Sequence, residues 1–149
     1  MSDGQQTYNA SIYKVDGAKA SEIFFKFVAD NSNVEWGLNE FADAHNYVST
    51  GHWPTSEVGA YALFNQSSMN FSGRQLIRSD HSHPGGIHSP SGQGTQGGDK
   101  NWAWGLQNRF QNKIRFDIYT PSDGISTPYK PGHNEPISLD EIKITPSSK

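Results

Sequence analysis

The sequence predicts one α/β domain in which a small antiparallel or mixed sheet packs against helices. The chain has 149 residues, which suits a single domain with a continuous core. Aromatic residues make up 12% of it, enough to build a core although only 33% of the residues are hydrophobic. Strand-like and helix-like hydrophobic patterns alternate along the chain. We therefore expect one domain over residues 1–149, with long polar loops.

The first predicted elements are a strand and an amphipathic helix. Apolar and polar residues mix over 8–15, which predicts a strand that ends at Asp16-Gly17. The next segment predicts a helix, because its apolar residues recur at helical spacing on a single face. These residues are Ala20, Ile23, Phe24, Phe27 and Val28. The helix should therefore present this apolar face to the rest of the domain.

Three strands are predicted in the middle of the chain. Apolar residues alternate with polar ones over 34–41, which indicates a strand with one buried face. Glu35 points away from that face. The segments 59–64 and 74–78 predict two further strands, with a polar stretch between them. Together these strands suggest a small antiparallel or mixed sheet.

A loop rich in Gly and Pro occupies residues 79–100. After it, Trp102, Leu106 and Phe110 recur at intervals of four residues, so a helix should begin near Asp99 and pack on the sheet. The remaining predicted elements are a strand over 113–120, a turn-rich stretch over 121–136 and a short final strand over 141–145.

Composition argues against several classes of function. The formal net charge is −3 and the 12 Lys and Arg are scattered, so no basic stripe is available for a nucleic acid backbone. No apolar run is long enough to cross a membrane, and the first residues, MSDGQQTYN, lack the features of a secretory signal. The chain has no Cys, which excludes disulfides, thiol nucleophiles and Cys-based zinc sites. Any transition metal must be held by His and carboxylate side chains.

A pair of histidines is the strongest sign of chemistry. His81 and His83 stand two residues apart at the end of a predicted strand, so their imidazoles project to the same side and can share one cation. Catalytic zinc takes three protein ligands, and Asp99, at the start of a predicted helix, is the natural third. From these residues alone, two solvated histidines and an Asp that only caps the helix are an alternative. The other histidines are expected on the surface: His45, His52, His88 and His133.

The order of these residues resembles the JAB/JAMM metalloproteases, also called MPN+ domains. That family carries a Glu on an early strand, then His-Ser/Thr-His-Pro, then a Ser and an Asp. The matching residues here are Glu35, His81-Ser82-His83-Pro84, Ser91 and Asp99. The family usually has its Asp three residues after the Ser, where this chain has Gly94, so the Gly-rich loop is longer here. The segments NSNVEWGL, HSHPGG, SPSG and IYTPSDG look like the JAB-like toxin domains at the C-terminal ends of bacterial RHS-repeat and other polymorphic toxins.

The resemblance implies a zinc metalloprotease or isopeptidase. Its implied Zn²⁺ ligands are His81, His83 and Asp99. Glu35 would act as the general base, and Ser91 would hydrogen-bond the oxyanion of the tetrahedral intermediate. The implied fold is JAB/MPN-like (cytidine-deaminase-like), a curved mixed sheet flanked by helices. The implied partners are a peptide or protein substrate and a cognate immunity protein, for an effector domain excised from a longer toxin that is secreted or injected.

Two other functions stay open at this point. Many MPN domains have lost the metal and serve as binding or scaffold modules, although every residue type needed for catalysis is present here. A non-hydrolytic metal protein such as a cupin-like domain also uses two histidines in this spacing. That pattern needs a Glu a few residues after the second His, where this chain has Ile87 and His88.

Overall fold

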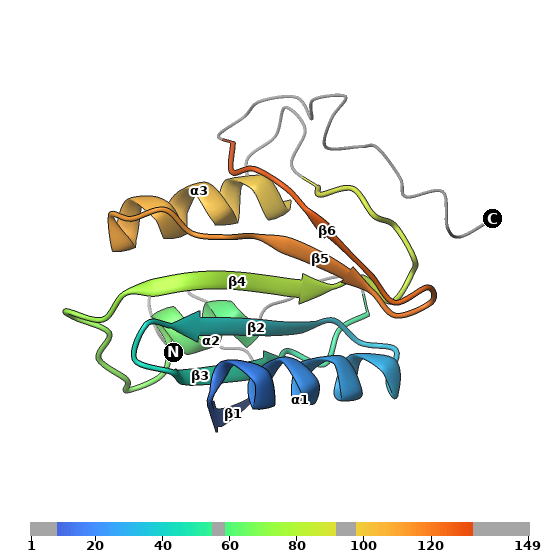
Figure 1. The fold of residues 1–149 in the computed structure, drawn as a ribbon, viewed down its shortest axis with the longest axis horizontal. Coiled ribbons are helices and arrows are strands. Elements are labelled where there is room, and N and C mark those ends of the chain that lie inside the picture. Colours follow the sequence, from blue (N-terminus) through green and yellow to red (C-terminus); the bar gives the residue numbers. More distant parts are fainter. Residues whose placement is uncertain (1–8, 55–58, 92–97, 133–149) are drawn as a thin grey trace.

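The computed structural model describes residues 9–54, 59–91 and 98–132. Its elements are β1 (Ser11–Asp16), α1 (Ala18–Asp30), β2 (Trp36–Phe41), β3 (His45–Thr50), α2 (Gly59–Asn65), β4 (Leu76–Ser82), α3 (Gly98–Phe110), β5 (Asp117–Thr120) and β6 (Ile125–Pro128). Within these described residues, six strands form one sheet in the order β1-β3-β2-β4-β5-β6 (Figure 1). All neighbours are antiparallel except β4 and β5, which run parallel. The predicted α/β class and mixed sheet are therefore confirmed.

The sheet has a hydrophobic core on each face. Figure 1 shows α1 in front of the sheet and α2 behind it. The core under α1 contains the buried residues Phe25, Ala29, Trp36, Leu38, Val48 and Tyr119. The core under α2 and α3 includes Phe41, Leu63, Leu76, Leu106 and Ile118. The strand predicted over 34–41 is present as β2. Because β2 contributes to both cores, all its residues are buried, and the prediction that only one of its faces is buried is wrong.

Helix α1 forms where the sequence predicts it, but only part of the predicted apolar face packs: Phe24 and Val28 are partly buried against the core. Its fully buried residues are Ser21, Phe25 and Ala29. Ile23 and Phe27, which the apolar periodicity placed on the packed face, are 59% and 62% exposed. Apolar residues cover more than half of this helix, so periodicity alone does not decide which stripe meets the sheet. The packing of Phe25 into the core under α1 decides it.

Several predicted strands differ from the observed elements. The segment 59–64 is helix α2 and not a strand, because a short apolar run suits either structure until its contacts are known. Gly59 allows α2 to approach β3, since a Cβ there would lie 2.6 Å from the backbone nitrogen of Thr50. Strand β3 was not predicted, and β6 lies in the stretch expected to be turns. The strand expected over 141–145 lies outside the described residues.

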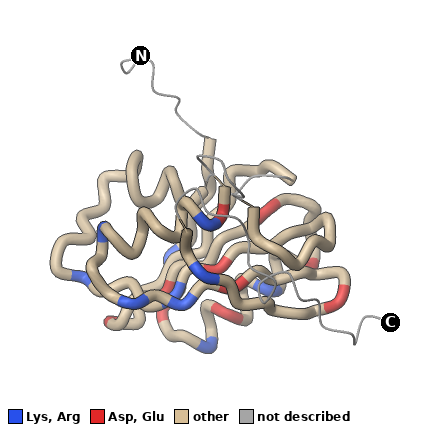
Figure 2. Tube along the Cα trace, turned by 90° about the horizontal axis from the view of Figure 1, so that it is seen from above, with Lys and Arg blue, Asp and Glu red and all other residues tan. Residues whose placement is uncertain are grey.

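Charged residues are interspersed over the described part of the chain. Figure 2 shows both basic and acidic residues distributed over the described trace. None of the described helices has the length and apolar character needed to cross a bilayer. The electrostatics of any site are therefore set by the residues immediately around it.

Candidate metal centre

Strands β2 and β4 place three functional side chains on one face of the sheet. Gly37 of β2 lies opposite His81 of β4 in the antiparallel register. Continuing that register by two residues sets Glu35 opposite His83, and side chains two apart in a strand share a face. The backbone N–H of His83 donates to the carbonyl of Tyr119 at 2.9 Å, which keeps the chain extended just past the end of β4. Glu35, His81 and His83 therefore point into the same space.

The donor atoms of these residues converge closely. The Nε2 atoms of His81 and His83 are 3.0 Å apart. Asp99 Oδ2 lies 3.2 Å from the first and 3.3 Å from the second. One ligand atom each of Glu35, His81 and His83 lie within 4.8 Å of one another, so this group could hold a metal ion. We call these three residues and Asp99 the metal centre; a single oxygen of Asp99 contacts both imidazoles.

Ser91 fixes the position of Asp99 at the start of α3. The Ser91 N–H donates to Asp99 Oδ2 at 3.0 Å, and the Asp99 N–H donates to Ser91 Oγ at 2.9 Å. The Lys100 N–H also donates to the carbonyl of Ser91 at 3.1 Å. These bonds hold Asp99 beside Ser91, although the two residues are 8 positions apart in the sequence. The Ser91 hydroxyl caps the helix, as serine side chains commonly do.

Backbone contacts also orient the other members of the metal centre. His83 Nδ1 lies 2.8 Å from the carbonyl oxygen of Ile87, which fixes the proton on Nδ1 and leaves Nε2 as the ligand atom. The N–H of Glu35 donates to the carbonyl of Trp53 at 2.7 Å. The ring of His81 packs edge-on against Tyr129, with centroids 5.9 Å apart. Sequence reasoning missed Tyr129, because no spacing connects it with β4.

Burial dominates the electrostatics of Glu35. This side chain is 7% exposed, and burial raises its carboxyl pKa from 4.5 to about 7, with His81 and His83 opposing the shift. Burial raises the pKa of Asp99 as well, yet the two imidazoles outweigh it and hold that pKa well below the ordinary value. The two carboxylates therefore differ in character: Asp99 is held as an anion, and Glu35 can gain or lose a proton near neutral pH.

His88 is buried, although it was predicted on the surface. Its Nε2 lies 2.7 Å from Asp123 Oδ2, in the turn between β5 and β6. The loop after β4 folds back on that turn, a contact between distant segments that spacing could not reveal. The exposed positions of His45 and His52 agree with the prediction, and His133 lies outside the described residues.

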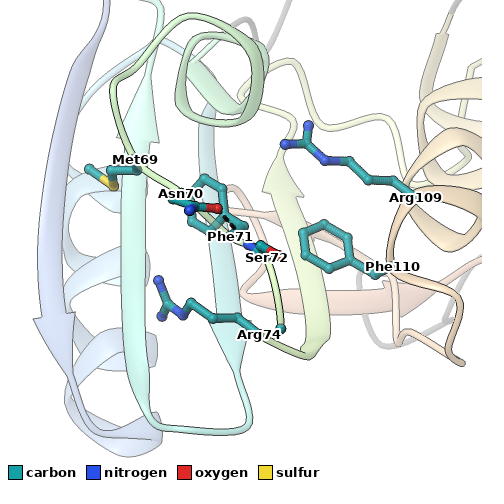
Figure 3. A pocket seen from close by; sticks show the side chains of 8 residues that line it. Met69, Asn70, Phe71, Ser72, Arg74, Arg109 and Phe110 are labelled. Carbon is teal, nitrogen blue, oxygen red and sulfur yellow. Dashed lines mark hydrogen bonds between the residues drawn. The ribbon is translucent and has the colours of Figure 1, made fainter.

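A separate cavity lies away from the metal centre. It has a volume of about 610 Å³ and is lined by the loop before β4 and the end of α3, including Phe71, Arg74, Arg109 and Phe110 (Figure 3). Arg74 is already bound to Asp43 by two hydrogen bonds of 2.9 and 3.2 Å. This cavity adjoins the start of β4, whereas the histidines stand at the other end of the strand.

Two imidazoles and two carboxylates at the end of a buried strand define a candidate metal-binding domain with a mixed α/β sheet. Residues 13–104 match the family described as JAB-like toxin 1. The match spans more than half of the 149 residues and includes the whole metal centre, and the chain belongs to this family. No curated protein and no solved structure shows significant similarity to the chain.

Proposed function

We propose that the chain is a zinc-dependent hydrolase of amide bonds, a peptidase or isopeptidase of the JAMM type with a JAB/MPN-like fold. His81, His83 and Asp99 hold the zinc ion, and Glu35 is the general base. The observation that carries the proposal is the convergence of three donor atoms at separations of 3.0 to 3.3 Å beside a buried glutamate.

The donor set fits zinc in number, kind and spacing. Catalytic zinc takes three His or carboxylate ligands and keeps one position open. With bond lengths of about 2.0 to 2.1 Å, two ligands of a tetrahedral ion stand about 3.3 Å apart. The three observed separations are 3.0, 3.2 and 3.3 Å. When bound there, zinc polarises an amide carbonyl and makes water a stronger acid.

Glu35 is placed to move protons in this reaction. Water attacks the amide carbon while its proton passes to the Glu35 carboxylate, and the same proton then passes to the leaving nitrogen as the C–N bond breaks. In the metal-free protein, burial raises the pKa of this carboxyl to about 7, so Glu35 is a stronger base than an exposed glutamate. Asp99 Oδ2 lies 3.2 and 3.3 Å from the two imidazoles, and one ligand atom of Glu35 lies within 4.8 Å of one on each histidine. The assignment of Asp99 as ligand and Glu35 as base is part of the proposal.

Ser91 is proposed as the donor to the oxyanion. Its oxygen accepts the Asp99 N–H, which leaves the hydroxyl hydrogen for another acceptor. Removal of one such donor typically costs about 3 to 4 kcal/mol of barrier. The same serine also positions Asp99, so its loss affects metal binding as well as the reaction.

The test separates metal binding from catalysis. Zinc is measured by elemental analysis of the purified protein, and hydrolysis by labelling the new amino termini formed in a bacterial lysate. Glu35→Gln should retain about one zinc per chain and lose roughly 10² to 10⁴-fold in rate. Glu40→Gln is the matched control, since Glu40 is a buried carboxylate on β2, the strand that follows Glu35, but pairs with Arg78. Full turnover by Glu35→Gln would remove its role as base, and loss of zinc would make it a ligand.

We further propose that residues 1–149 form a single toxin domain, excised from a longer secreted or injected protein, that acts on a protein target and is blocked by an immunity protein. Membership of a JAB-like toxin family supports this role. Expression of the native domain should slow bacterial growth, and expression of His83→Ala should not. Equal growth of both strains in every compartment tested would refute the toxic role.

A further inference from the structure

Two exposed apolar side chains stand beside the metal centre. Trp53 is 52% exposed and Ile87 is 63% exposed, and they are two of the eight large hydrophobic side chains that are exposed among the described residues. The backbone carbonyl of Trp53 accepts the N–H of Glu35, and that of Ile87 contacts His83 Nδ1. The main chain of Trp53 is therefore bonded to Glu35, the proposed base, and the main chain of Ile87 to His83, a proposed ligand.

The loop that carries Ile87 is tied down on both sides of this residue. The Gly86 N–H donates to the carbonyl of His83 at 3.1 Å and closes a tight turn. His88, the next residue, is buried against Asp123. An apolar side chain held in this way loses little conformational freedom when it meets a ligand.

Trp53 is held by an equivalent set of contacts. The Thr50 hydroxyl donates to the carbonyl of Glu35 at 2.6 Å and accepts the N–H of His52 at 3.0 Å. His52 Nε2 in turn lies 2.9 Å from Ser11 Oγ. The indole is thus presented from a fixed backbone beside Glu35, and Trp is the residue type most enriched among binding hot spots.

We propose that Trp53 and Ile87 are specificity-determining residues, which contact large apolar side chains of a polypeptide substrate on the two sides of the cleaved amide. This inference rests on the proposed function. The main-chain contacts to Glu35 and His83 are the reason for placing Trp53 and Ile87 next to a substrate chain bound at the metal centre. Burial of apolar surface against Trp53 and Ile87 then favours substrates with residues such as Leu or Phe at these positions.

Binding to the zinc-loaded Glu35→Gln protein tests the inference without turnover. The probes are fluorescently labelled peptides of Gly, Ser and Ala that carry a central pair of Leu-Phe, Asp-Ser or Lys-Ser, followed by anisotropy. The Leu-Phe peptide should bind at least about tenfold more tightly than the polar peptides. Trp53→Ala and Ile87→Ala, each added to Glu35→Gln, should each weaken that binding about tenfold, and Trp53→Phe should restore most of it. Phe27→Ala is the matched control, because this side chain is 62% exposed on α1.

The outcomes distinguish the inference from the proposed function. Equal binding of the peptides, no binding of any, or unchanged affinity in Trp53→Ala and Ile87→Ala would overturn the inference. Cleavage of all peptides by the native protein without preference would overturn it while supporting the proposed hydrolase. Selective binding of the Leu-Phe peptide without cleavage by the native protein would support the inference and count against the hydrolase. Zinc content and melting temperature, unchanged in both alanine variants, exclude unfolding as the cause.

Discussion

Replacing Glu35 by Gln should stabilise the metal-free protein at neutral pH and leave its stability unchanged in acid. Burial raises the pKa of this carboxyl from 4.5 to about 7, so the folded state holds the proton more tightly than the unfolded state does. Below about pH 4 both states are protonated and ionisation costs nothing. As pH rises from about 4.5 to 7 the unfolded chain gains stability by ionising, and the native fold loses relative stability.

The expected size of this effect follows from the pKa. A change from 4.5 to about 7, at roughly 1.4 kcal/mol per pKa unit, gives at most about 3.5 kcal/mol. For a chain of this length that corresponds to roughly 5 to 10 °C in melting temperature. Urea denaturation of the apo native and Glu35→Gln proteins, from about pH 4 to 8, measures the difference in unfolding free energy.

A control of opposite sign is available at the surface. The hydrogen bond from His45 lowers the pKa of Asp16, so Asp16→Asn should give no stabilisation at neutral pH. Both variants remove one negative charge, and a general charge effect would move them together. If Glu35→Gln is no more stable than the native protein near pH 7.5, or if its advantage is the same at pH 4, Glu35 is not the buried, desolvated acid described here.

Three further outcomes are expected. Zinc at about 100 times its dissociation constant should raise the unfolding free energy by about 2.7 kcal/mol, measured by thermal denaturation. His83→Ala should abolish this increase. An equal increase in that variant would exclude His83 as a ligand. Ser91→Ala should cost about 1 kcal/mol of stability, because the α3 cap is lost. It should also weaken zinc binding through Asp99, and calorimetry can measure the zinc affinity. Unchanged zinc affinity would contradict the positioning role of Ser91. Phe25→Ala should cost about 3 to 5 kcal/mol and Phe27→Ala less than about 0.5 kcal/mol in urea denaturation, and similar costs would contradict the observed face of α1.

Local patterns in the sequence were sufficient for part of the fold. The amphipathic spacing predicted α1, and the recurrence of Trp102, Leu106 and Phe110 predicted α3. Alternation in an extended chain predicted that His81 and His83 share a side. Each of these inferences uses residues within one element, where the backbone period alone fixes relative direction.

The tertiary structure decided what depends on contacts between elements. The antiparallel register of β2 and β4 brings Glu35 to the imidazoles, and the hydrogen bonds between Ser91 and Asp99 bring the helix start to the same place. Packing between elements also decides that α1 buries Phe25 and that 59–65 form a helix. It buries His88 against Asp123 as well. A hydrophobic period gives the direction of a side chain relative to its own element. It does not state which neighbour occupies that direction, because that depends on packing between segments far apart in the chain.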